Sequence, residues 1–252
     1  MRLKLISCEI FYREICAAIS RSVNTVDVEF LPKGLHDIGT AAMRERLQGA
    51  LDRVDGLRYD AILLAYGLCN NGTAALEART VPIVLPRAHD CIAVFLGSRE
   101  RYLAYFDSHP GVFFKTTGWI ERGTDDGELS QISIQRRTGF DTSYEELVSR
   151  YGKENADYLQ EALSSYLKQY RRLTFIEMGI EPDDSFERQA REEAARRGWS
   201  FEKIPGDMSL IQRLVDGQWD ERDFLILRPG QRVVARYDDG IIAGEPTRRM
   251  DD

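Results

Sequence analysis

Three of the four cysteines in the sequence stand where they could bind a metal ion. Cys8, Cys69 and Cys91 each come shortly after an apolar run, and His89 precedes Cys91 by two residues. Thiolate sulfur and imidazole nitrogen are ligands that suit zinc and iron–sulfur centres. The sequence therefore predicts a metal centre held by these four side chains, with zinc expected and a [4Fe–4S] cluster as the alternative. A further alternative is that the thiols are small apolar core residues, as free cysteines commonly are.

Two carboxylates are candidates for catalytic proton transfer. Asp90 separates His89 from Cys91, so it can orient the imidazole or act as a general base. Glu177 ends another apolar run and is a candidate acid, base or further metal ligand. The structural alternatives are ion pairs, of Asp90 with Arg87 and of Glu177 with an arginine.

The substrate is expected to bind next to these ligands. Glycines let a backbone turn tightly and approach a ligand closely, and asparagine and arginine side chains donate hydrogen bonds to an anion or a carboxylate. The candidate substrate-binding residues around the predicted centre are Tyr66, Gly67, Asn70, Asn71, Gly72, Arg87, Ser98 and Arg99. A plain turn is the alternative for residues 67–72, and a helix N-cap is the alternative for Ser98.

The remaining cysteine and the two other histidines are expected to be structural. Cys16 falls inside the first predicted helix, which favours a place in the core. His36 and His109 lie in predicted loops, which favours the surface.

These candidates must be positioned by strands that alternate with helices. Apolar strand patterns cover residues 3–7, 26–31, 59–66 and 81–85, and a helical pattern covers residues 40–54. Uninterrupted apolar strands separated by helices are typical of a parallel sheet that is covered on both faces. Ligands bind at the carboxyl ends of such strands, which is where the three cysteines fall.

The alternation continues after residue 97 and resumes in the second half of the chain from residue 173 onward. Strands are predicted at residues 111–116, 173–178, 199–204 and 223–227. Helices are predicted at residues 99–107, 144–172, 185–197 and 209–216, with an interruption of the second near Gly152. A connection is predicted at residues 121–142 and a hairpin around residues 238–240. We therefore predict an α/β fold of two Rossmann-like lobes with parallel sheets flanked by helices. Residues 1–142 would carry the Cys/His cluster, residues 143–252 would form a long helix and the second lobe, and the site would lie at the strand carboxyl ends between the lobes.

The composition excludes several classes of protein. The 252 residues include 34 Lys or Arg and 41 Asp or Glu, which gives a net charge of −7, and 43% are hydrophobic. Clustered basic residues drive binding to nucleic acids and to anionic membranes, so neither partner is expected. No apolar run reaches the roughly 18 residues of a membrane span, and no apolar signal segment follows Met1, so the protein is expected in the cytoplasm.

Several short motifs resemble the uncharacterised "domain of unknown function 1638" family. The motifs are YGLC (residues 66–69), PRAHDCI (86–92), LGSR (96–99), YF (105–106), PG (110–111) and TGW (117–119). The resemblance covers most of the chain and is densest from residue 3 to residue 119. Proteins similar to this chain are often encoded beside corrinoid proteins and corrinoid-dependent methyltransferases, which implies a role in one-carbon metabolism of methylated amines.

The residues and the resemblance together give two hypotheses. In the first, the chain is a metal-dependent methyltransferase or a component of corrinoid-dependent methyl transfer, in which a metal-bound thiolate accepts a methyl group and Asp90 or Glu177 handles the proton. Its partners would be a small-molecule substrate, a corrinoid in contact with the site, and a corrinoid protein or methyltransferase. In the second, the chain is a non-catalytic module that binds a corrinoid, a folate or a partner methyltransferase. An iron–sulfur enzyme with a three-cysteine cluster and a purely structural zinc site are further alternatives.

Overall fold

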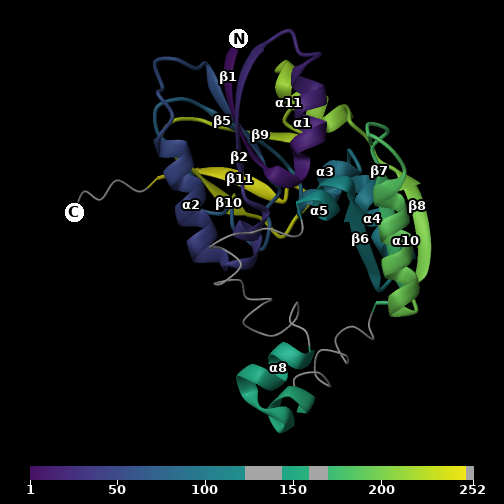
Figure 1. Cartoon of the computed structure of the whole chain (residues 1–252). Helices are drawn as coiled ribbons and strands as arrows, with labels where there is room; N and C mark the ends of the chain where they lie inside the picture. The colour runs from purple at the N-terminus through teal and green to yellow at the C-terminus, as the bar shows by residue number, and fades with distance from the viewer. Residues whose placement is uncertain (123–143, 159–169, 248–252) are drawn as a thin grey trace.

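A computed structural model of the chain describes residues 1–122, 144–158 and 170–247. Within these residues the strands form three sheets (Figure 1). Most of the predicted connection at residues 121–142, and part of the helix predicted at residues 144–172, lie outside the described residues. The described part of that helix begins with α8 (Tyr144–Tyr151), and its predicted interruption is confirmed at Gly152, which has a φ of +76°.

The larger sheet contains the strands that precede the three candidate cysteines. Its order is β2-β1-β3-β5-β9. The parallel strands are β1 (Arg2–Cys8), β2 (Thr25–Leu31), β3 (Ala61–Ala65) and β5 (Ile83–Pro86), and β9 (Phe224–Leu227) runs antiparallel to β5 at the edge. The chain leaves β1 toward β2 and later returns to place β3 on the other side of β1. The order therefore reverses between β1 and β3, and this is the position where α/β sheets bind ligands.

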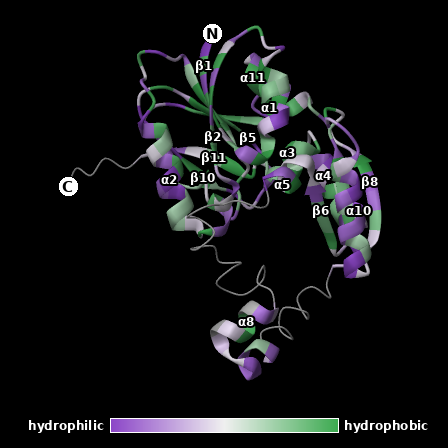
Figure 2. Cartoon of the chain, in the orientation of Figure 1, coloured by the Kyte–Doolittle hydropathy of each residue, from purple (hydrophilic) through white to green (hydrophobic). Residues whose placement is uncertain are grey.

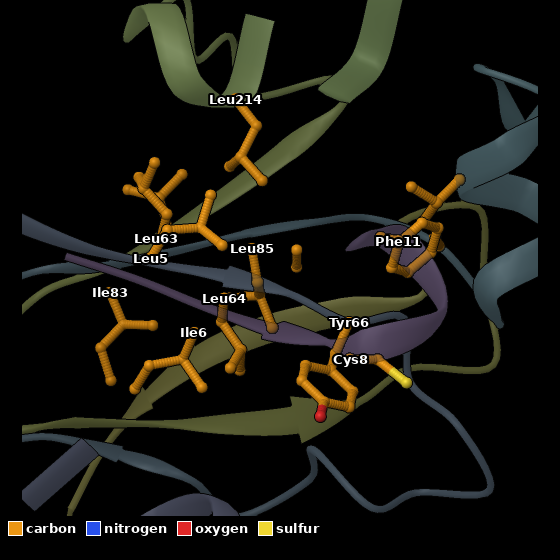
Figure 3. Packing of buried hydrophobic residues seen from close by; sticks show 14 of the residues in the cluster. Leu5, Ile6, Cys8, Phe11, Leu63, Leu64, Tyr66, Ile83, Leu85 and Leu214 are labelled. Atoms are coloured by element: carbon orange, nitrogen blue, oxygen red, sulfur yellow. The ribbon is translucent and has the colours of Figure 1, made fainter. Parts of the chain in front are cut away.

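Helices cover both faces of the larger sheet. α1 (Tyr12–Ile19) and α11 (Ser209–Asp216) lie on one face and α2 (Thr40–Asp52) lies on the other (Figure 1). Figure 3 shows Leu214 of α11 above Leu5 of the sheet. Because both faces are covered, β3 (AILLA) and β5 (IVLP) consist of apolar residues only, whereas β1 also carries Arg2 and Lys4; hydrophobic residues are green and hydrophilic ones purple in Figure 2.

The smaller parallel sheet has its own core. Its order is β6-β7-β8, formed by β6 (Val112–Thr116), β7 (Arg172–Glu177) and β8 (Ser200–Pro205). α10 (Ser185–Arg197) packs on one face, and Leu173, Phe175, Ala190 and Ala194 are buried between helix and sheet. α10 ends at Gly198, whose φ of +68° provides the left-handed helix end that glycine favours.

The third sheet is antiparallel and packs on the core of the larger sheet. Its order is β11-β10-β4, formed by β4 (Glu77–Ala78), β10 (Gln231–Ala235) and β11 (Ile242–Pro246). The turn between β10 and β11 confirms the predicted hairpin. The short helical elements around the site are η1 (Glu9–Phe11), η2 (Lys33–Asp37), α3 (Cys91–Phe95), α4 (Arg99–Ser108) and α5 (Thr117–Glu121). No helix in the described part of the chain is long and apolar enough to cross a membrane.

The α/β class and the parallel, covered sheet are confirmed, but the pairing of two strands differs from the prediction. β9 was expected in a second lobe and instead pairs antiparallel with β5 in the larger sheet. β6 was expected in the first lobe and instead pairs with β7. An apolar run indicates burial but not strand direction or partner, which explains both differences. Strand pairing thus crosses the expected boundary at residues 142/143 in both directions, and the division into two Rossmann-like lobes stays a prediction.

The prediction for Cys16 is wrong. Cys16 is exposed, whereas its neighbours Ile15 and Ala18 on α1 are fully buried. Only one face of α1 meets the sheet and α11, and residues on the opposite face point to solvent.

Candidate functional site

A narrow cavity lies at the carboxyl ends of the four parallel strands of the larger sheet. Its wall consists mainly of apolar side chains and cysteines: Cys8, Ile10, Phe11, Pro32, Lys33, Leu35, His36, Met43, Tyr66, Gly67, Cys69, Cys91 and Trp119. Cys8 ends β1, Lys33 follows β2, Tyr66 follows β3 and Cys91 follows β5. Every parallel strand of this sheet therefore supplies a residue, and the cavity spans the point where the strand order reverses.

The cavity is small. Its volume is about 20 Å³. A volume of roughly 10–15 Å³ is needed to hold one water molecule, so the space suits a single water molecule or ion. A larger substrate does not fit without movement of the walls.

The three candidate thiols all line this cavity, as predicted from their strand-end positions. Cys8 and Cys69 are buried and Cys91 is partly buried. Burial raises the pKa of the Cys8 thiol to about 12, and burial also raises the pKa values of Cys69 and Cys91 well above the ordinary cysteine value. The thiols lie near enough to one another that a charge on Cys8 raises the pKa of the other two. In the metal-free chain the thiols are therefore protonated at neutral pH and are poor nucleophiles.

Two polar groups beside the thiols lack ordinary hydrogen-bond partners. The Tyr66 hydroxyl is buried beside Cys8, and the Trp119 indole N–H is buried beside Cys91. Figure 3 shows Tyr66 and Cys8 next to each other beyond the apolar layer of the sheet. Each group points a donor toward the neighbouring sulfur and lowers the pKa of that thiol against the larger effect of burial.

A buried cation lies at the same cavity. Lys33 is 9% exposed, and its Nζ lies 5.2 Å from the centroid of the Trp119 ring. Its charge favours the ionised form of the Cys8 thiol, because it lowers the pKa of that group against the larger effect of burial. Lys33, the Tyr66 hydroxyl and the Trp119 indole N–H are thus three side-chain groups that would stabilise thiolate charge at this site.

Backbone contacts hold Cys69 beside the segment that carries Cys91. The Leu68 N–H donates to the Ala88 carbonyl at 2.8 Å and the Cys69 N–H donates to the His89 carbonyl at 3.0 Å. A Cβ atom on Gly67 would come within 2.8 Å of the Asp90 Cα atom, so only glycine permits this approach.

The turn that carries Cys69 has an unusual backbone. Cys69, Asn70 and Asn71 have φ values of 46°, 53° and 62° in succession. Left-handed conformations are unfavourable for non-glycine residues, and such strain is concentrated at functional sites. The side chains of Asn70 and Asn71 are exposed, and Gly72 packs against the Met43 sulfur. Of the predicted substrate-binding residues, only Tyr66 and Gly67 line the cavity.

His89 and Asp90 are placed differently from the predicted arrangement. The His89 side chain is exposed, lies outside the cavity and has its ring centroid 6.4 Å from that of Tyr102. Asp90 is the N-cap of α3: its Oδ1 accepts from the backbone N–H groups of Ile92 at 2.9 Å and Ala93 at 3.1 Å. Its Oδ2 accepts from the Tyr102 hydroxyl at 3.1 Å. The carboxylate therefore has structural partners on both oxygens and does not orient the His89 imidazole.

Glu177 does not reach the cavity. It ends β7 in the smaller sheet and accepts from the Lys203 Nζ at 3.0 Å. The ion-pair alternative for Glu177 is thus the observed arrangement, with a lysine in place of the expected arginine.

Three other predicted binding residues meet in a second, larger cavity. Arg87, Ser98 and Arg99 line a volume of about 480 Å³, and this cavity shares no lining residue with the first. Burial lowers the pKa of Arg87, and its guanidinium donates to the carbonyls of Glu221 and Gly240 at 2.9 Å. The Ser98 hydroxyl accepts from a backbone N–H of α4 as its N-cap, and Arg99 pairs with Asp239. The structure brings these three residues together but gives each of them a structural partner.

The sequence analysis missed Lys33, His36 and Trp119. Lys33 and His36 follow the second strand at the same sheet edge as the cysteines, so the strand-end argument could have found them. Trp119 belongs to α5, which follows a strand of the other parallel sheet, and no sequence signal places it beside Cys91. In residues 1–122, 144–158 and 170–247, no three His, Cys, Asp or Glu side chains are already arranged to hold a metal ion.

Comparison with known proteins gives one result. A family model described as "Protein of unknown function (DUF1638)" matches residues 30–215, a range that contains Lys33, Cys69, Cys91 and Trp119. No curated protein and no solved structure matches the chain. Because the matched range covers well over half of the sequence, the chain belongs to the domain of unknown function 1638 family.

Proposed function

We propose that the chain binds a single metal ion through the thiolates of Cys8, Cys69 and Cys91, and that this ion is zinc. The observation that carries this proposal is that three thiols from the ends of three separate strands line one cavity of about 20 Å³. Thiolates are preferred ligands of zinc, and a cavity of this size suits one ion better than a four-iron cluster.

The electrostatics of the cavity support the same proposal. A coordinating ion displaces the proton of a thiol, so it would offset the burial that keeps these three thiols neutral. Three thiolates and a divalent ion leave one negative charge, which the buried Lys33 ammonium would balance.

Binding requires the thiols to change position. Among the residues that the structure describes, no three His, Cys, Asp or Glu side chains are already placed to hold a metal ion. A cysteine sulfur moves between staggered positions by rotation about a single bond, so coordination needs no change in the sheet. The left-handed turn at Cys69 is the backbone segment that we expect to adjust.

Metal analysis of variants in which one cysteine is replaced at a time tests this proposal. We expect the wild-type chain, purified without air, to bind one zinc ion, and Cys8→Ser, Cys69→Ser and Cys91→Ser each to weaken binding by at least about tenfold. Cys16→Ser is the matched control, because Cys16 is exposed on α1 and should leave the affinity unchanged. A wild-type chain that binds neither zinc nor iron would overturn the proposal. If the purified chain contains iron and labile sulfide, the centre is an iron–sulfur cluster and not a zinc site.

The reaction that we propose for this centre is methyl transfer to a thiolate, in the cytoplasm and in association with a corrinoid protein. The support is the family resemblance together with the thiol cluster. A zinc ion keeps a bound thiol ionised and nucleophilic at neutral pH. Asp90 and Glu177 make structural contacts, so we no longer assign the proton to them. We also propose that two Rossmann-like units flank the site, because Trp119 follows a strand of the smaller sheet.

Incubation with a methylated corrinoid tests the reaction. We expect the zinc-loaded chain to demethylate the corrinoid in the presence of a small thiol that replaces one protein ligand of the zinc. The thiolate sulfur would bond to the methyl carbon, the cobalt–carbon bond would break, and the products would be the methyl thioether and the Co(I) corrinoid. Cys91→Ser should lose the reaction and Cys16→Ser should retain it. Tight binding of the corrinoid without turnover in the zinc-loaded chain would favour the non-catalytic module.

A further inference from the structure

We infer that His36 is the fourth ligand of this centre and that Asp37 positions it, an inference that rests on the proposed metal binding. His36 lies on η2, the short helix that follows β2, and its side chain lines the same cavity as the three thiols. Zinc is usually four-coordinate, and three thiolates with one imidazole are a common set. The geometry thus points to His36, which the sequence analysis expected at the surface, in place of His89.

The contacts of the His36 ring favour the tautomer that binds metals. Its Nδ1 lies 3.3 Å from Oδ1 of Asp37, whose side chain is 8% exposed. If the Nδ1–H donates to this carboxylate, Nε2 carries the lone pair that a metal would bind after exchange of its present neighbour. Nε2 lies 3.5 Å from the Asn70 Nδ2, a donor in the turn that carries Cys69. A donor at this position is consistent with an acceptor lone pair on Nε2.

His36 is also held at the mouth of the cavity. Its ring meets the Trp119 ring edge to face with a centroid distance of 6.4 Å, and its side chain is 36% exposed. An imidazole that is partly exposed and partly against the cavity can turn inward when an ion arrives. His89, by contrast, is exposed outside the cavity and contributes only its backbone carbonyl, to Cys69.

Titration with cobalt(II) tests the role of His36 without any assay of activity. Cobalt(II) substitutes for zinc, and its visible and near-ultraviolet absorption reports thiolate ligation and coordination number. We expect the wild-type chain to give the intense bands of a tetrahedral thiolate site. His36→Gln should weaken cobalt binding by at least about tenfold and shift the visible bands, whereas the matched variant His89→Gln should behave as wild type.

The Asp37 contact provides a second readout. Asp37→Asn should weaken cobalt binding by about 10- to 100-fold, as expected for loss of a carboxylate that orients a ligand histidine. In a chain that already carries His36→Gln, the same change should have almost no further effect, because the two residues act through one ligand. Equal effects of Asp37→Asn in both backgrounds would show that Asp37 does not act through His36.

The outcomes separate this inference from the proposed function. If the wild-type chain gives no thiolate–cobalt absorption, the metal centre itself is wrong and the inference falls with it. If the bands appear, are lost in Cys69→Ser and are unchanged in His36→Gln, the three-thiol centre stands and the role of His36 is refuted. If His89→Gln has the larger effect, His89 is the fourth ligand and the side chain must turn inward from its exposed position.

Discussion

Both carboxylate oxygens of Asp90 accept hydrogen bonds within the fold. They accept from two backbone N–H groups at the start of α3 and from the hydroxyl of Tyr102. We expect Asp90→Ala to lower the free energy of unfolding by about 1–2 kcal/mol, because an N-cap is lost. Urea denaturation followed by circular dichroism measures this change. Asp90→Asn is the control, since asparagine caps helices equally well, and a loss as large as that of Asp90→Ala would contradict the capping role.

Glu14 is a buried carboxylate whose proton is linked to folding. It is 1% exposed, neither carboxyl oxygen has an ordinary hydrogen-bond partner, and burial raises its pKa to about 7. Glu181 and Glu121 raise this pKa further, and Arg13 lowers it. The folded chain therefore keeps a proton that the unfolded chain releases near pH 4.5, so stability is lost as pH rises from about 4.5 to about 7.

Replacement of Glu14 removes this pH dependence. We expect Glu14→Gln to be more stable than wild type above pH 7, by up to about 3 kcal/mol, and the difference to shrink toward pH 4.5. Denaturant unfolding across this pH range measures the effect. Glu45→Gln, at an exposed position of α2, controls for the loss of a negative charge. Parallel stability–pH profiles of wild type and Glu14→Gln would contradict the shifted pKa.

The sequence located the three sulfur atoms and Tyr66 of the candidate site but not Lys33, His36 and Trp119. Cys8, Cys69 and Cys91 lie together because the ends of parallel strands meet at one edge, a rule that needs only strand positions. The direction of a side chain within a turn depends on local φ and ψ values that hydrophobic patterns do not contain. His89 therefore lies outside the cavity and His36 lines its wall, although both follow strands of the same sheet.

At the scale of elements, α5 packs on η1 through a glycine. A Cβ atom on Gly118 would overlap the carbonyl oxygen of Ile10, which is a backbone atom and cannot move aside cheaply. We expect Gly118→Ala to lower the free energy of unfolding by about 1–3 kcal/mol. Thermal or urea unfolding measures the loss, and the same variant should displace Trp119, whose fluorescence reports its surroundings.

A second glycine offers the matched control. Gly49 lies within α2, where an added Cβ has only one neighbour, the Arg53 guanidinium at 3.9 Å. Alanine is favoured over glycine in a helix interior by about 1 kcal/mol, so Gly49→Ala should stabilise the chain. Similar effects of the two substitutions would show that the contact between α5 and η1 does not depend on the close backbone approach.

Helices and buried strands were predicted well because their patterns are local. The bounds of α10 and α11 agree with the predicted helices, and the strands differ by one or two residues at their ends. The partner of β9 was not predictable in this way. The pattern of buried residues along β9 is the same whether the strand pairs parallel or antiparallel with its neighbour. Its antiparallel pairing with β5 depends on the path of the chain after α11, which the pattern does not contain.

At the scale of the whole molecule, the larger sheet depends on the second half of the sequence. β9 covers the edge of β5, and α11 buries Leu210, Ile211, Leu214 and Val215 against the same core. We therefore expect a fragment of residues 1–142 to lack a cooperative unfolding transition and to bind a hydrophobic dye, because both elements are missing. Circular dichroism melts and dye fluorescence of the fragment and the full chain make the comparison. A cooperative melt of the fragment would support an independent first lobe.

β9 is synthesised long after β5, the strand whose edge it covers, because it lies near the end of the sequence. A chain emerging from the ribosome exposes β1, β2, β3 and β5 long before residues 224–227 appear. Until then β5 presents an open strand edge, and open edges invite pairing with other nascent chains. At about 5–20 residues per second, the interval between the two strands lasts several seconds or more. The time spent with this edge unprotected, rather than the stability of the finished fold, would then set how much of the protein is recovered in soluble form.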